Sequence, residues 1–235
     1  IPKEAVKIYL LTIANSNFEE WFNENPDKSI DEFKFDFKKI SASGTLFDVD
    51  KLFNISKNYL SKLKATTIYE NLLKYTEEFD KEFYDILKNH KEFAISVFNI
   101  ERETPKPRKD YKSYSDIKNH VWYMFDEYFT NLNYEFLKIN DKEEIKNILS
   151  TYLDKYLDLS DKDVWFLKIK EMCDSLGYAS NMKDYKKNPE NCKGSVAHAC
   201  EVIRVSVTNR TMTPDLYEIL KLLGKDRIKE RISKF

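Results

Sequence analysis

The sequence predicts an all-α fold, and three features of its composition and patterning carry that prediction. Charged residues make up 34% of the 235 positions, while glycine occurs only 4 times and proline only 6 times. Such a composition favours long amphipathic helices over sheets with many tight turns. Apolar residues recur at helical spacing along most of the chain, with lysine and glutamate on the opposite faces. The hydrophobic content of 42% is sufficient for a core in one large or two small domains.

The first quarter of the chain is expected to contain short helices separated by polar breaks. Residues 3–21 fit one or two helices that are interrupted at 15–17. Asp48 is placed to cap a helix that runs to about Leu63. Between 33 and 37, three phenylalanines alternate with charged residues, and this pattern fits a strand, a short helix or an extended connection.

The middle of the chain again shows helical spacing, from residue 67 to residue 99, and is followed by a proline-bearing connection. Pro105 and Pro107 exclude a continuous helix from Arg102 to Arg108. The apolar positions expected to be buried before that connection are Tyr69, Leu72, Leu73, Tyr75, Phe79, Phe83, Ile86 and Leu87. Further helices are expected at 115–129, 142–156, 161–176, 195–208, 214–223 and 226–233.

Several classes of protein are disfavoured. The three cysteines, Cys173, Cys192 and Cys200, contain no CxxC pair, which argues against a disulfide framework or a metal site and favours a reducing, cytoplasmic location. No apolar stretch approaches the roughly 20 residues of a membrane span, so no membrane partner is expected. The net charge of −1 gives no general basicity. Any contact with nucleic acid must therefore come from a local patch.

The most informative segment is 202–231, VIRVSVTNRTMTPDLYEILKLLGKDRIKER. Two apolar helical runs flank a polar turn, Thr213 can cap the second helix with Pro214 at its first position, and Gly224 is placed to end it. The segment resembles the C-terminal anticodon-binding region of bacterial glutamyl-tRNA synthetases, whose last helices read approximately PLR-x-ALTG-x-x-x-[ST]P-G-L-F-E-x-L-x-L-L-G-K. Asn209 and Asp215 depart from that pattern, because the family commonly has glycine at both places.

The resemblance extends upstream more weakly and leaves a divergent middle. IPKEAVKIYLLTIANSNFEEW looks like the family segment Y-x-P-E-A-x-x-N-Y-L-x-x-L-G, and KKISASGTLFDVDKLFNISKNYL looks like [KR]-x-S-K-S-x-A-x-F-D-x-x-K-L-x-x-x-N-x-x-Y-I. The fold that this implies is a multi-helix anticodon-binding bundle preceded by the end of a stem-contact region. The expected domains are 1–66 for the stem-contact end, 67–137 for a first anticodon-binding subdomain and 138–235 for a second.

The resemblance also implies what the parent enzyme does, namely the ATP- and Mg²⁺-dependent attachment of glutamate to its tRNA by a class I aminoacyl-tRNA synthetase. The chain lacks an initiator methionine and is expected to be a fragment without the catalytic domain, inactive alone and without a cofactor. Residues 39–43, KISAS, look like the ATP-binding KMSKS loop, but Ala42 stands where its second lysine would be and cannot supply charge to a phosphate. The expected partner is the anticodon loop of glutamate tRNA, bound by a monomer, with no DNA.

Two arginines are the leading candidates for RNA contact. The resemblance places Arg108 near the family's arginine that contacts the third anticodon base, which distinguishes glutamate from glutamine tRNAs. The alignment leaves Lys109 and Arg102 open as substitutes, and a solvated surface arginine is the alternative. Arg204 lies inside an apolar helical run, where a charge is costly unless it reaches an edge or a partner, and it matches the arginine of the PLR motif.

The alternative for Arg204 is a buried salt bridge to Glu201 or Asp215. Leu216 either supports a flipped base or belongs to the core. The complete set of candidate RNA-binding residues is Arg102, Arg108, Lys109, Arg204, Arg210, Thr213, Pro214 and Leu216.

Two rival functions stay open at this stage. A non-enzymatic helical protein-interaction module would be favoured by an exposed aromatic surface near Trp122 together with a salt-bridged arginine corner. A self-contained enzyme would need a cluster of acid, base or nucleophile residues, and the sequence shows none. The aromatic-rich region from Tyr111 to Phe129 has the helical spacing that is typical of core more than of a stacking platform.

Overall fold

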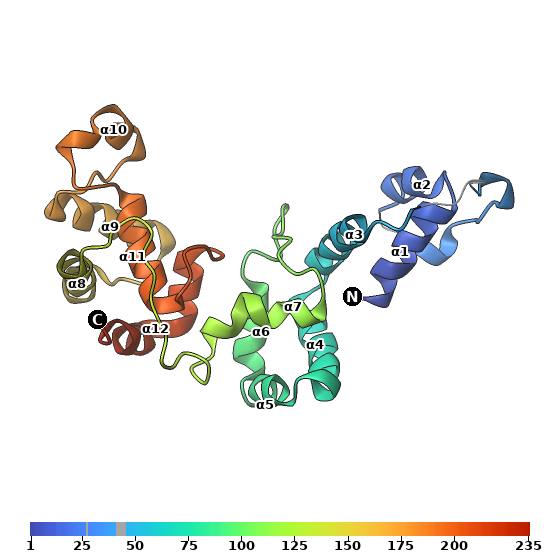
Figure 1. Ribbon diagram of the computed structural model, residues 1–235, viewed down its shortest axis with the longest axis horizontal. Coiled ribbons are helices and arrows are strands. Elements are labelled where there is room, and N and C mark those ends of the chain that lie inside the picture. Colours follow the sequence, from blue (N-terminus) through green and yellow to red (C-terminus); the bar gives the residue numbers. More distant parts are fainter. Residues whose placement is uncertain (27, 41–45) are drawn as a thin grey trace. The chain divides into compact units, whose positions relative to one another are not determined.

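The computed structural model describes residues 1–26, 28–40 and 46–235, and within them the protein is helical without a strand (Figure 1). The one sheet-like feature of these ranges is an isolated bridge between Ala179 and Ser195. The all-α prediction is therefore confirmed. The chain forms two compact units, Ile1–His120 (unit 1) and Val121–Phe235 (unit 2). The finer division into 1–66, 67–137 and 138–235 stays a prediction.

Unit 1 contains short helices whose breaks fall at polar residues. Its elements are α1 (Lys3–Ala14), α2 (Phe18–Glu24), η1 (Ile30–Glu32), η2 (Phe37–Lys39), α3 (Val49–Lys62), α4 (Ala65–Phe79), α5 (Lys81–Asn89), α6 (Lys91–Asn99) and α7 (Tyr114–Val121), whose last residue passes into unit 2. The break predicted at 15–17 separates α1 from α2. The alternating phenylalanines form no strand, since two 3-10 turns, η1 and η2, flank a short connection.

Side-chain caps explain several of these boundaries. The carboxylate of Asp48 accepts a hydrogen bond from the Lys51 amide, which confirms the cap predicted for α3. Asp80 ends α4 and caps α5 through the Phe83 amide at 3.1 Å. Phe79 is 63% exposed, so the prediction that it is buried is wrong. The reason is that α4 ends at Phe79, which stacks on Tyr75 at 4.9 Å outside the core.

Unit 2 is built around one buried helix, α11. Its elements are η3 (Trp122–Met124), α8 (Lys142–Thr151), the π-helical turn η4 (Tyr152–Tyr156), α9 (Lys162–Leu176), α10 (Met182–Lys187), η5 (Pro189–Asn191), α11 (Val196–Thr208) and α12 (Leu216–Ile232). Helix α11 contacts α8, α9 and α12, and apolar residues such as Val202, Ile203 and Val207 are buried along it. The helix predicted at 115–129 is shorter, because α7 gives way to η3 at Trp122.

The C-terminal helix α12 is interrupted where the sequence predicts an end. Gly224 has φ 74° and ψ 164°, a left-handed backbone conformation that favours glycine. The helix stops there and resumes towards Ile232, which confirms the predicted break between two helical segments, although the first begins at Leu216 and not at 214. The KISAS resemblance cannot be followed here, because Ala42 lies outside the described residues.

Candidate nucleic-acid interface

The corner between α11 and α12 is held by its own polar groups. Asn209 ends α11 in the left-handed conformation, φ 52° and ψ 31°, and its amide donates to the Val205 carbonyl at 2.7 Å. Asparagine adopts this conformation more readily than most residues, so it serves in place of the family's glycine. The hydroxyl of Thr208 donates to the Arg204 carbonyl at 2.7 Å and accepts from the Arg210 amide at 3.2 Å. The turn is therefore fixed through its backbone.

The two arginines of this corner, Arg204 and Arg210, have no ion-pair partner in the described part of the chain. Arg204 is half-buried, and its Nε has no hydrogen-bond partner among the residues that the structure describes. Burial raises the pKa of Cys200 on the same helix to about 11, and the positive charge of Arg204 opposes that rise. A half-buried guanidinium without an acid beside it is costly unless a ligand or solvent satisfies it.

Glu201, one acid proposed to neutralise Arg204, is engaged elsewhere. The Glu201 carboxylate accepts from the amides of Leu137 and Lys138 at 2.8 and 3.0 Å and pairs with the Lys138 ammonium at 3.5 Å. The salt bridge to Arg204 that the sequence left open is absent, because these amides and this ammonium already surround the buried carboxylate.

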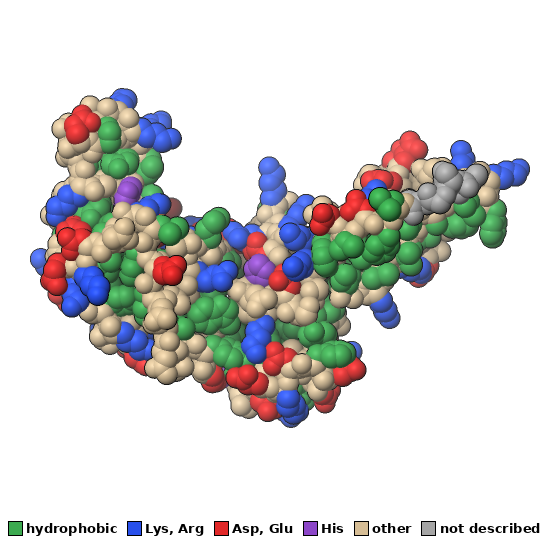
Figure 2. All heavy atoms as spheres, in the orientation of Figure 1, with side chains coloured by type: hydrophobic (Ala, Val, Ile, Leu, Met, Phe, Trp, Pro, Cys, Tyr) green, Lys and Arg blue, Asp and Glu red, His purple; other side chains and the backbone are tan. Residues whose placement is uncertain are grey.

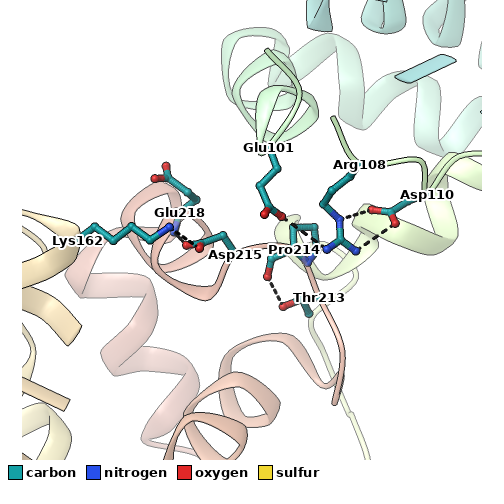
Figure 3. A network of polar contacts seen from close by, with 8 residues as sticks. All are labelled: Glu101, Arg108, Asp110, Lys162, Thr213, Pro214, Asp215 and Glu218. Carbon is teal, nitrogen blue, oxygen red and sulfur yellow. Dashed lines mark hydrogen bonds and ion pairs between the residues drawn. The ribbon is translucent and has the colours of Figure 1, made fainter. Parts of the chain in front are cut away.

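The other proposed partner, Asp215, pairs with Lys162 at 2.6 Å (Figure 3). Asp215 is also the N-cap of α12, since its carboxylate accepts from the Glu218 amide at 3.2 Å. Thr213 donates instead to the Pro214 carbonyl at 2.9 Å. The predictions that Thr213 caps this helix and that Pro214 is its first residue are therefore wrong. A carboxylate has a full charge to offer the positive end of a helix, so Asp215 is the stronger cap.

The apolar side chains of the corner divide between core and surface. Leu216 is 5% exposed and belongs to the core of unit 2. Met212 is 82% exposed on the connection between the two helices. The sequence did not single out Met212, because a lone methionine in a polar turn carries no spacing signal. Its flexible thioether chain is suited to contact with the face of an unstacked base.

In unit 1, Arg108 is held by two acids of its own connection (Figure 3). Its Nε and Nη2 donate to the two carboxylate oxygens of Asp110 at 2.7 and 3.1 Å, and its Nη1 lies 3.6 Å from a carboxylate oxygen of Glu101. The side chain is 41% exposed. This pairing orients the planar guanidinium and offsets its charge, which weakens its attraction for a bare phosphate.

The two alternatives to Arg108 lie in different environments. Lys109 is exposed, whereas Arg102 is 9% exposed and inserted into unit 1. The guanidinium of Arg102 donates to the carbonyls of Phe98, Leu60 and Leu63 at 2.7, 2.6 and 3.2 Å. It therefore caps the last turn of α3 and fastens it to α6. Burial lowers the pKa of Arg102.

Arg231, which the sequence analysis did not single out, is a buried arginine that holds the end of α11 in unit 2. Its side chain is 2% exposed, and its Nη1 donates to the carbonyls of Tyr123 and Val207, both at 2.7 Å. Its Nη2 pairs with Asp126 at 2.6 Å, and the guanidinium lies 3.9 Å from the ring centre of Phe129. Val207 precedes the turn by two residues, so Arg231 fixes the end of α11.

Other kinds of site find little support. Within the ranges that the structure describes, no group of three or more histidine, cysteine, aspartate or glutamate side chains is arranged to hold a metal ion. None of the described helices has the length and apolar character of a membrane-spanning segment. On the face shown in Figure 2, acidic and basic side chains are interspersed over each unit. Binding of a nucleic acid would therefore depend on small groups of residues and not on a broad basic surface.

Comparison with known proteins first defines the class. Residues 190–235, which contain the whole corner, match the family model of an anticodon binding domain. The match identifies this C-terminal segment of the all-helical fold as similar to an anticodon binding domain.

The relatives define the family. The chain is 44% identical over 230 residues to a glutamate–tRNA ligase of Acetivibrio thermocellus, covering 98% of this chain and 42% of the relative. It is 41% identical to a glutamate–tRNA ligase of Clostridium perfringens, covering all of this chain and 43% of the relative. The chain belongs to the glutamate–tRNA ligase family and spans about two fifths of the length of these relatives.

A solved structure confirms the fold. The crystal structure of a glutamate tRNA ligase from Elizabethkingia meningosepticum matches with a TM-score of 0.64 over 98% of this chain and 40% of that protein. The sequence identity is 17%, so the likeness concerns the arrangement of the helices.

Proposed function

We propose that this chain is the C-terminal, tRNA-binding part of a glutamate–tRNA ligase and that it recognises the anticodon of glutamate tRNA. The carrying observation is the α11–α12 corner, where Arg204 and Arg210 lie without acidic partners among the described residues on a turn fixed by Thr208 and Asn209. The anticodon-binding match over this corner and the names of the relatives support the same function.

The chemistry suits a single-stranded loop. Unpaired bases expose edges that accept hydrogen bonds and faces that stack on apolar groups. Arg204 and Arg210 supply planar donors, and Met212 supplies an exposed apolar contact beside them. In the parent enzyme, a catalytic domain outside this chain would activate glutamate with ATP and Mg²⁺ and transfer it to the tRNA. We expect that enzyme to act in the cytoplasm as a monomer.

The rival interaction module is not favoured, because neither of its two requirements is met. Near Trp122, the side chains of Tyr123, Phe125 and Phe129 are each 3% exposed or less, so the aromatic region is mostly core. The arginine corner is not salt-bridged within the described residues.

Replacing Arg204 with alanine is expected to weaken binding of glutamate tRNA about tenfold, the loss of one charge-assisted hydrogen bond of about 1.4 kcal/mol. The melting temperature should stay nearly unchanged, because the Arg204 guanidinium has no hydrogen bond or ion pair to any described residue. Binding is measured by fluorescence anisotropy with labelled tRNA, and stability by thermal unfolding. Lys229→Ala removes an equal charge from an exposed site on α12 and is expected to have a smaller effect on binding. A large loss of stability with unchanged affinity would show that Arg204 is structural.

The isolated chain is expected to form no glutamyl adenylate, since its sequence contains neither a glycine-rich phosphate cradle nor a complete lysine-bearing ATP loop. Glutamate-dependent exchange of pyrophosphate into ATP, measured with and without tRNA, should stay at the level of a protein-free blank. The full-length relative from Acetivibrio thermocellus provides the positive control. Exchange activity in the purified chain would refute the assignment of catalysis to another domain.

A further inference from the structure

A groove in unit 1 carries an unbalanced positive charge. The groove has a volume of about 990 Å³ and lies between the end of α3, the start of α4 and the proline-bearing connection. Figure 1 shows that connection as an extended loop after α6. Four exposed lysines line the groove, Lys62, Lys64, Lys106 and Lys109, together with one carboxylate, that of Glu103.

None of these four lysines has an ion-pair partner among the described residues. Four like charges with a single acid among them repel one another, and they raise the local concentration of anions. Pro105 and Pro107 alternate with the lysines of the connection and restrict its backbone. The ammonium groups are therefore presented by a segment that loses little backbone freedom when a ligand binds.

The helix ends at the groove add to the same potential. At the C-terminal end of α3, the carbonyls of Leu60 and Leu63 accept hydrogen bonds from Arg102, which offsets part of the negative end of that helix dipole. Helix α4 spans 15 residues and begins after Lys64, and no side chain caps its first turn. Lys64, the N-cap of α4, lines the groove, so the positive end of this helix dipole begins beside the groove.

We propose that this groove binds phosphates of the tRNA backbone and sets the position of the RNA without reading its bases. The proposal rests on the proposed function, tRNA binding by this chain. Lysine is a compact point charge that attracts phosphate from many directions, whereas base reading requires planar, oriented donors. The groove lysines have no acid pairs in the described residues, while Arg108, a few positions away, is oriented by Asp110. In this proposal the groove lysines bind the phosphates, and Arg108 contacts a base.

The test is the salt dependence of tRNA binding by the whole chain, with the lysines of the groove removed in pairs. The variants are Lys62→Gln/Lys64→Gln, Lys106→Gln/Lys109→Gln and the combination of all four. Each phosphate contact contributes about 0.7 to 0.9 to the slope of log K against log salt concentration. Each pair should therefore lower the magnitude of the slope by about 1.5, and the combination by about 3. The preference for the correct third anticodon base should stay unchanged.

Lys74→Gln/Lys91→Gln is the matched control, because both lysines are exposed on unit 1 outside the groove. It should leave the slope within experimental error, and circular dichroism verifies that all variants fold. A wild-type slope in the combined variant would overturn the groove proposal while leaving tRNA binding intact. Absence of tRNA binding by the wild-type chain would overturn the proposed function and the groove with it. Saturable binding of inorganic phosphate that the combined variant loses, with no change in the tRNA slope, would assign the groove to a small anion.

Discussion

Replacing Arg231 with alanine is expected to destabilise unit 2 by about 3 to 5 kcal/mol. The substitution leaves the carbonyls of Tyr123 and Val207 without their 2.7 Å donor in a place that solvent does not reach easily. It also removes the guanidinium that covers Phe129 and pairs with Asp126. Since the Val207 carbonyl belongs to the last turn of α11, the variant should lose tRNA affinity as well.

The measurement is denaturant unfolding followed by tryptophan fluorescence. Trp122 and Trp165 both lie in unit 2, so a Trp21→Phe background restricts the signal to that unit. Arg227→Ala is the control, because Arg227 contacts the same Asp126 carboxylate at 3.0 Å but is 32% exposed. Its cost should be about 1 kcal/mol or less. Equal costs for the two variants would mean that the buried hydrogen bonds of Arg231 contribute nothing specific.

The contrast between Arg231 and the predicted helices shows what the sequence can reveal. Asp48 and Gly224 act on residues within one helical turn of themselves, so their roles follow from local sequence. Arg231 binds Tyr123, which lies 108 positions earlier, and no local pattern distinguishes it from the other basic residues of that helix. Thr213 shows that local sequence can leave two candidate caps, because Asp215 lies two residues later and its carboxylate, the stronger acceptor, caps the helix.

Part of the candidate interface can be predicted from the sequence, and part of it cannot. Arg204 is conspicuous in the sequence because a charge interrupts an apolar helical run, a conflict visible within a few residues. The basic groove is not conspicuous, because its lysines come from residues 62–64 and 106–109, and each pair alone resembles an ordinary solvated surface. Their proximity in three dimensions, and the lack of an ion-pair partner for each of them among the described residues, are properties of the fold.

Replacing Arg108 with alanine is expected to cost about 1 to 3 kcal/mol of discrimination at the third anticodon base, if its guanidinium makes a bidentate base contact. Asp110 already holds two of its donors in parallel, so the plane of the guanidinium is fixed before RNA binds. The acids at 101 and 110 also reduce its value as a phosphate anchor. These contacts favour a role that depends on orientation more than on charge.

The decisive quantity is the ratio of affinities for glutamate tRNA and for a variant whose third anticodon base is changed from C to G, with aminoacylation of the same pair by the full-length enzyme as a second readout. Arg108→Lys keeps the charge but loses the fork of donors, so it should lower the ratio nearly as much as alanine. Lys109→Ala removes a groove lysine and should weaken both tRNAs alike with a shallower salt dependence. An unchanged ratio in Arg108→Ala would reject base reading by this residue. A reduced ratio in Lys109→Ala alone would assign base reading to Lys109 instead of Arg108. It would also contradict the assignment of Lys109 to phosphate binding.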